Sequence, residues 1–365
     1  MTSDPNSLCA ALRGERDADD AIVEQARRHR VDRLLLAERH PEAKREVLLD
    51  DLATRELQTV LVALDAEGIE PIVFKGAALA HTHYAESWLR PRLDADLLIA
   101  PDQRRRVFEI LARLGYRQPP MVSGELISYQ AMFVRAHPIG VEHVLDVHWK
   151  IAERQAVAQA LTYEELRARS HRITVPGGAM RVPSPIDALL ISCIHRAAHH
   201  QDAADLIWVY DIHLTASRLT AGEWVRFVDL AVERQVSSLC ARGLQLAVDG
   251  LHTNIPSGVR DRLAGTREAS TVFLRRDLRG IDRLAADLWA VGPRRAPRLL
   301  VEHLFPPASY IRERYRVRHR ALVPAFYAYR IVAGAAGWLR RPQPSSEAPE
   351  RRGIVRSPSH HISDA

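Results

Sequence analysis

The stretch Pro71–Ala100, PIVFKGAALAHTHYAESWLRPRLDADLLIA, determines how the rest of the chain is organised. It opens with a β-rich run at 72–74 that ends at Lys75-Gly76, and a segment of small residues follows directly. A second apolar run occupies 97–99. This order predicts a strand, a glycine turn, a helix, a loop and a second strand.

Two aspartates introduce the second predicted strand. Because side chains along a strand alternate with a period of two, Asp94 and Asp96 point to the same face. Adjacent carboxylates repel each other, and such a pair commonly holds a divalent cation. Gly76, at the predicted start of the helix, allows backbone N–H groups to approach a phosphate. Together these features indicate chemistry on a nucleotide.

These motifs resemble the signature of the uncharacterised nucleotidyltransferase family, part of the DNA polymerase β superfamily. The matching residues occur in the family's order over roughly 45–335, and they are Lys75-Gly76 with Leu79, Tyr84, Arg90-Pro91, Asp94-x-Asp96-Leu97-Leu98, Asp146-Val147-His148-Trp149, His195 and Trp208-Val209-Tyr210-Asp211. The superfamily's usual Gly-Gly or Gly-Ser pair is Gly76-Ala77 here. A phosphate cradle at this turn would therefore use backbone groups rather than a serine hydroxyl.

The resemblance implies Mg²⁺- or Mn²⁺-dependent transfer of a nucleotidyl group from ATP or another NTP to an acceptor hydroxyl, with release of pyrophosphate. It implies that the catalytic, metal-holding residues are Asp94, Asp96 and Asp146. The residues expected to bind the nucleotide are Lys75, Gly76, Ala77, Arg90, Arg92 and His148. We expect His148 to lie beside the metal rather than to ligate it, because Mg²⁺ prefers oxygen. The acceptor is open: a small molecule, a sugar, a peptide, a protein or RNA.

Two other functions fit parts of the same pattern. Metal-dependent glycosyltransferases also carry a DxD pair, but they would need neither Asp146 nor Gly76. A non-catalytic nucleotide- or RNA-binding module on the same fold is the second alternative, and three intact aspartates argue against it.

His195 and His199 have a spacing that can bind zinc. Since no HExxH glutamate accompanies them, we favour hydrogen-bonded cleft histidines, with Asp211 at the domain interface.

Length and composition limit the class of protein. A chain of 365 residues predicts two domains, and 47% hydrophobic with 26% charged residues is typical of soluble globular proteins. Three scattered cysteines fit a reducing compartment, and no signal peptide or membrane span is evident, so we expect a cytoplasmic protein. A net charge of +6 favours an anionic partner.

We expect an α+β protein: a polymerase-β-like domain with a small mixed sheet and helices, followed by an all-helical domain. The expected boundaries are a disordered N-terminus at 1–17, the catalytic domain at 18–183, the helical domain at 184–341 and a disordered tail at 342–365. Arginines crowd together over 294–320, beside an apolar segment. They suggest a peripheral contact with an anionic membrane surface or with RNA.

Overall fold

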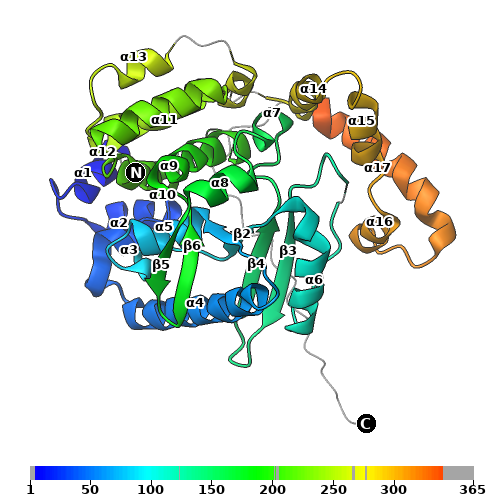
Figure 1. Ribbon diagram of the computed structural model, residues 1–365, viewed down its shortest axis with the longest axis horizontal. Helices are drawn as coiled ribbons and strands as arrows, with labels where there is room; N and C mark the ends of the chain where they lie inside the picture. Colours follow the sequence, from blue (N-terminus) through cyan, green and yellow to red (C-terminus); the bar gives the residue numbers. More distant parts are fainter. Residues whose placement is uncertain are drawn as a thin grey trace.

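The computed structural model of the protein describes residues 5–122, 124–200, 202, 205–264, 268–275 and 278–339. The tail predicted at 342–365 lies outside these residues. Figure 1 shows a central sheet with helices packed around it, a helical layer beside it, and helices α14–α17 forming an arm at one side. The predicted α+β class, a small mixed sheet followed by a helical region, is confirmed.

Six strands form one mixed sheet in the order β3-β4-β2-β1-β6-β5. Their bounds are β1 Ile72–Phe74, β2 Ala95–Leu98, β3 Gln130–Ala136, β4 Glu142–His148, β5 His171–Val175 and β6 Gly178–Val182. β2 runs parallel to β4, and this register pairs Asp96 with Asp146 and Leu98 with His148. Since side chains alternate along each strand, the polar side chains of β2 and β4 meet on one face.

The two faces of the sheet bury different cores. On one face Leu97 and Leu145 pack with α4 (Ala43–Asp65) and α6 (Arg104–Arg113), because both helices present apolar stripes. On the other face Phe74 packs against the helical region. The polar side chains of β2 and β4 share that second face, so the fold directs them toward the helices.

The helical region starts soon after the last strand. Its helices are α9 Pro185–Ile194, α10 Leu206–Ala216, α11 Ala221–Glu233, α12 Ser237–Leu251, α13 Val259–Leu263, α14 Gly280–Val291, α15 Ala296–Leu304, α16 Ala308–Arg314 and α17 Val323–Leu339. Ser184 caps α9 by accepting a hydrogen bond from the Asp187 N–H. The boundary expected at 183 falls between β6 and α9 and stays a prediction. Among the described helices, none combines the length and the apolar composition that crossing a membrane requires.

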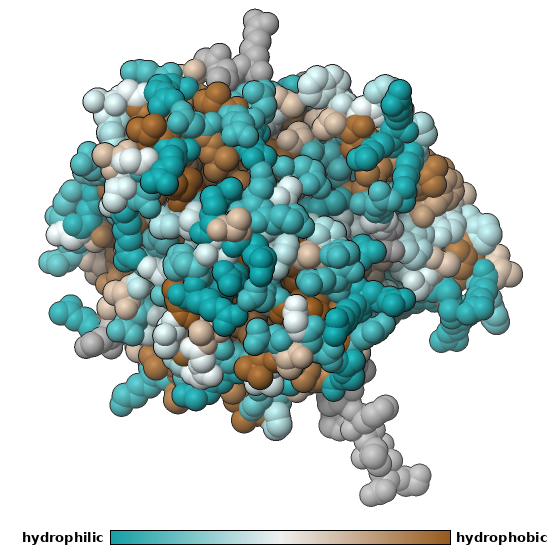
Figure 2. Space-filling model, in the orientation of Figure 1, coloured by the Kyte–Doolittle hydropathy of each residue, from teal (hydrophilic) through white to brown (hydrophobic). Residues whose placement is uncertain are grey.

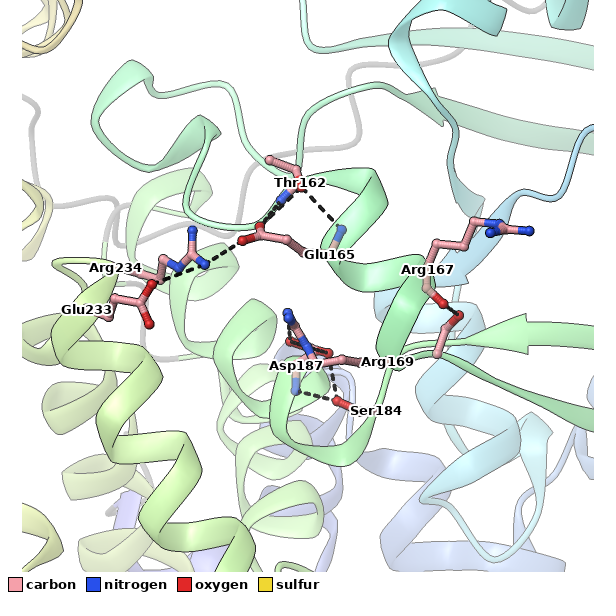
Figure 3. Close-up of polar contacts among 9 residues, drawn as sticks. Thr162, Glu165, Arg167, Arg169, Ser184, Asp187, Glu233 and Arg234 are labelled. Atoms are coloured by element: carbon pink, nitrogen blue, oxygen red, sulfur yellow. Dashed lines mark hydrogen bonds and ion pairs between the residues drawn. The ribbon is translucent and has the colours of Figure 1, made fainter.

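A polar network ties the sheet region to the helical region (Figure 3). Arg169, at the end of α8 (Tyr163–Arg169), donates to both carboxylate oxygens of buried Asp187 in α9, at 2.7 and 3.0 Å. Glu165 completes the capping box of α8 and also pairs with Arg234, just after α11. α8 is therefore fixed to two helices at once, which holds the sheet at a set position against them.

Residues 5–12, within the segment expected to be disordered at 1–17, form a helix. Helix α1, Pro5–Leu12, is present because Leu8 is fully buried in an apolar cluster with α2, Asp20–Arg28. Arg30, whose φ is 57°, separates α2 from the short helix α3, Asp32–Leu36. Polar residues cover most of the face seen in Figure 2, with apolar residues scattered among them.

Candidate active site

Lys75 occupies the centre of the site. Helix α5, Lys75–Thr82, begins immediately after β1, and Lys75 at the junction has a φ of 51°, a left-handed conformation that costs a non-glycine residue of order 1 kcal/mol. Its buried Nζ lies 2.8 Å from Asp96 Oδ1 and 3.3 Å from His148 Nε2. His148 Nε2 is itself 2.8 Å from Asp96 Oδ1. The strained turn thus holds an ammonium group between a carboxylate and an imidazole.

Asp146 completes the polar cluster from the neighbouring strand. Its Oδ2 accepts a hydrogen bond from Gln130 Nε2 at 2.8 Å, whereas its buried Oδ1 has no hydrogen-bond partner among the described residues. Ligand atoms of Asp96, Asp146 and His148 all lie within 4.8 Å of one another. Two carboxylates and one imidazole at this spacing can hold a divalent cation.

The carboxyl groups of the site respond differently to their surroundings. Burial alone would raise the pKa of Asp96, but the Lys75 ammonium and the hydrogen bond from His148 hold it well below its usual range. Burial and the nearby Asp96 carboxylate raise the pKa of Asp146 to about 6. Asp94 reaches solvent just before β2, yet the protein around it and the charges of Asp96 and Asp146 raise its pKa to about 7. Such mutual repulsion favours a bound cation.

His148 is neutral in this environment. Burial and the Lys75 ammonium lower its pKa to about 4, and its side chain is fully buried. The structure therefore places His148 among the convergent ligand atoms, closer to a metal-binding role than the sequence suggests, while the Asp94 carboxylate is not one of the three that converge.

Arg90 forms a buried clamp rather than an open phosphate contact. Its Nε and Nη2 donate to Asp211 Oδ1 and Oδ2 at 2.9 and 2.7 Å, and Tyr84 Oη donates to Oδ1 at 2.8 Å. Burial alone would lower the pKa of Arg90, but the Asp211 carboxylate raises it above its ordinary value. Asp211 lies on α10, so this clamp joins the loop before β2 to the helical region.

The remaining expected nucleotide-binding residues are also tightly packed. Arg92 forms an ion pair with Asp50 at 2.5 Å. A Cβ at Gly76 would collide with the guanidinium of Arg90, so the glycine is needed for this close approach. Ala77 is buried in the core beneath the sheet. Lys75, Gly76 and Ala77 thus lie together at the start of α5, while both arginines are engaged by carboxylates.

The histidines expected to line the cleft lie on a π-helical turn, His195–His199. His195 Nε2 is 3.0 Å from His200 Nε2, and the ring of His199 packs edge-on against Tyr129 at 6.1 Å. Among the described residues these histidines do not bring three metal-ligand atoms together. His195 is thus hydrogen-bonded to a neighbouring histidine, whereas His199 makes ring contacts, and their role in the site stays a prediction.

Two residues of the site were not predicted from the sequence. Gln130 orients Asp146, and Tyr129 packs beside His148 with ring centroids 5.6 Å apart. No local motif marks the contact between Gln130 and Asp146. It follows only from the register of β3 and β4, which pairs Gln130 with His148. Asp211 was already named from the sequence. It is a lone carboxylate in an apolar helix, and such a residue indicates a buried cationic partner.

A strand–turn–helix unit, a DxD pair and a third aspartate on the adjacent parallel strand define a nucleotidyltransferase-type protein. A family model described as "Uncharacterised nucleotidyltransferase" matches residues 15–252, which is more than half of the chain. The chain belongs to this family, and the resemblance seen in the sequence is confirmed.

Two solved structures are similar to parts of the chain. One is a solution structure of the antibiotic-resistance factor ANT(2'')-Ia, with 15% identity, a TM-score of 0.34, and coverage of 55% of this chain and 96% of that one. The other is a crystal structure of an antigenic nucleotidyltransferase-like protein from Paracoccidioides brasiliensis, with 17% identity, a TM-score of 0.32, and coverage of 51% and 92%. Comparison with curated proteins gives no match.

Proposed function

We propose that the protein transfers a nucleotidyl group from an NTP, such as ATP, to an acceptor hydroxyl. The hydroxyl oxygen forms a bond to the α-phosphorus, the bond from that phosphorus to the bridging oxygen breaks, and pyrophosphate and a proton are released. The observation that carries this proposal is the convergence of Asp96, Asp146 and His148 around the start of α5, with Asp94 beside them.

The residues of the site fit a divalent cation. Asp146 Oδ1 is buried without a partner, and the Asp96 and Asp146 carboxylates repel each other across paired strands. We propose that Asp94, Asp96 and Asp146 hold Mg²⁺ or Mn²⁺, with His148 as a further ligand. When bound, such ions stabilise the attacking and leaving oxygens of an in-line displacement.

The protein's own groups have distinct tasks in this proposal. The Lys75 ammonium, freed from Asp96 when a cation binds, neutralises phosphate charge, and N–H groups at the start of α5 approach the phosphates. Arg90 and Arg92, whose charges are offset by Asp211 and Asp50, act by positioning the loop that carries Asp94. Gln130 orients Asp146 toward the acceptor hydroxyl.

Paired variants test the assignment. Each labelled NTP is incubated with Mg²⁺ and a cell extract, and the labelled product is then identified. We expect Asp146→Asn to bind Mg-NTP but to lose transfer by about a hundredfold or more, whereas Asp96→Asn loses both. Exposed Asp261→Asn is the control. Transfer by Asp146→Asn at the wild-type rate would contradict the site and favour a DxD glycosyltransferase.

We also propose where the reaction takes place and what else the chain contacts. Cys9, Cys193 and Cys240 are buried and form no disulfide among the described residues, which supports a reducing compartment such as the cytoplasm. Most arginines of 294–320 are exposed on the arm, which supports an anionic contact, with a membrane surface or RNA as the two candidates.

A further inference from the structure

A cavity of about 1110 Å³ lies beside Gln130, the residue that donates a hydrogen bond to Asp146. It lies at the end of β3 and β4, and its walls include residues from α6, from 118–122 and 124–131, and from α15 and α16. Gln130 lines the cavity and also donates to Asp146, so a molecule in the cavity lies one side chain away from the reacting groups. This volume is sufficient for a small-molecule ligand.

The wall formed by the segment before β3 is fixed in place. Glu302 on α15 accepts hydrogen bonds from three consecutive backbone N–H groups, those of 125, 126 and 127, at 3.1, 2.9 and 3.2 Å. Lys150 donates to the carbonyl oxygens of Glu125 and Leu126 at 2.8 and 3.1 Å. A wall held this firmly loses little freedom when a ligand binds.

The lining carries an excess of positive charge. Its four cationic residues are Arg104, Arg105, Lys150 and Arg298, and its two acidic residues are Glu125 and Glu164. Arg298 pairs with Glu125 at 2.5 Å and with Glu302 at 3.0 Å, so these charges offset one another. Among the described residues, neither Arg104 nor Lys150 has a carboxylate at ion-pair distance.

An aromatic surface lies next to Arg104. The Arg104 guanidinium sits 4.8 Å from the ring centroid of Trp149, and Phe108 packs beside that ring with centroids 6.2 Å apart. The like charges of Arg104 and Lys150 repel each other, and an anionic group placed between them would relieve the repulsion. The same walls would repel a cationic ligand.

We propose that this cavity binds the acceptor, and that the acceptor is an anionic hydroxy compound with an apolar or aromatic part. This proposal rests on the nucleotidyltransferase function proposed above. Arg104 and Lys150 hold the negative group, Trp149 and Phe108 pack against the apolar part, and the hydroxyl reaches past Gln130 toward Asp146.

Direct binding tests the cavity without turnover. Phenyl phosphate, phenol and phenethylamine serve as probes, titrated by calorimetry into the full chain. We expect phenyl phosphate to bind at least about tenfold more tightly than the other two, the scale of one charge-assisted hydrogen bond. Arg104→Gln should remove most of this preference. Arg106→Gln, which removes a charge from the same turn of α6 outside the cavity lining, should keep affinity within about twofold.

Several results would overturn the proposal. They are undetectable binding of phenyl phosphate, equal binding of the amine, or unchanged affinity in Arg104→Gln. The anionic group held by these cations could belong to the acceptor or to the nucleotide. Saturating the protein with Mg²⁺ and a non-hydrolysable NTP before the titration distinguishes the two. Phenyl phosphate should still bind, whereas its displacement would assign the cations to the nucleotide and reject the proposal.

The labelling experiment in cell extract tests the acceptor class separately from the proposed nucleotidyl transfer. If the labelled acceptor is an anionic compound, both the proposed reaction and the proposed acceptor class are supported. Nucleotidyl transfer to a neutral or cationic acceptor would leave the function standing and reject the acceptor class. Phenyl phosphate binding without transfer of any NTP would support the anion site and reject the proposed reaction.

Discussion

Lys75 Nζ and Asp96 Oδ1 lie 2.8 Å apart, so the ammonium group occupies a position beside the carboxylate that a divalent cation would also seek. His148 contacts both partners. The ion pair keeps the buried Asp96 carboxylate compensated before any cation or nucleotide binds.

Replacing Lys75 by Met should change cation and nucleotide binding in opposite directions. Without the competing ammonium, Asp96 is free, so Mn²⁺ alone should bind more tightly than to wild type. NTP affinity should fall by about tenfold, because a charge-assisted phosphate contact is lost. Titration of Mn²⁺ by electron paramagnetic resonance, with calorimetry for the NTP, measures both. Unchanged Mn²⁺ affinity would show that Lys75 does not compete for Asp96.

Gly76→Ala should destabilise the protein by about 2–4 kcal/mol. The added Cβ collides with the Arg90 guanidinium and pushes it away from Asp211. Gly222→Ala in α11 is the control, since a Cβ there meets no atom within 4 Å, and it should stabilise by about 0.5–1 kcal/mol. Denaturant unfolding of both variants gives the comparison, and equal stability of the two would contradict the close packing at Gly76.

Arg90→Met should cost about 3–5 kcal/mol of unfolding free energy, because it leaves the buried Asp211 carboxylate without its cation. Adding Asp211→Leu to this variant should recover part of the loss, since an apolar pair replaces an unpaired charge. Arg55→Met, at the exposed pair with Asp51, should leave stability nearly unchanged. A double-mutant cycle with strictly additive effects at Arg90 and Asp211 would count against the clamp.

His143 should make stability depend on pH. It is buried on β4 with Nδ1 2.5 Å from Tyr116 Oη, and burial lowers its pKa to about 4. Below pH 6.5 the unfolded chain binds a proton at this residue, whereas the native state does not until about pH 4. The free energy of unfolding is therefore unaffected by the titration of this residue above pH 6.5. It falls as the pH drops from 6.5 toward 4, by up to roughly 3 kcal/mol.

Unfolding curves at several pH values check this dependence. His143→Gln removes the titrating group while keeping a hydrogen-bonding side chain, so its stability should fall less steeply between pH 6.5 and 4 than that of wild type. His171→Gln on the exposed end of β5 is the matched control. Equal slopes for wild type and His143→Gln would refute the assignment.

Local patterns predicted much of the site. The run ending at Lys75-Gly76 and the alternation around Asp96 and Asp146 predicted the strands and the start of the helix, because these depend on neighbours in sequence, whereas the left-handed residue at the turn is Lys75 rather than Gly76. The family resemblance supplied the link between Asp96 and Asp146, which are 50 residues apart and meet only through the parallel register of β2 and β4.

Long-range partners could not be predicted in the same way. Arg90 has the same sequence features whether it faces phosphate or Asp211, and only the packing of α10 against the sheet decides between them. Leu48 belongs to an apolar stripe typical of a buried helix face, yet it is 70% exposed, because nothing described covers that end of α4. Burial depends on which element arrives from elsewhere in the chain.

The wall that α15 and α16 contribute to the cavity has a consequence for how such enzymes diversify. Residues 298–309 lie beyond the 15–252 segment that defines the family, whereas Asp96, Asp146 and His148 lie within it. Changes of sequence in the arm can therefore reshape the cavity that we propose for the acceptor, without altering the carboxylates or the start of α5. If the proposed function holds, one nucleotide-activating core serves different acceptors, and replacing α15 and α16 is a direct route to new specificity.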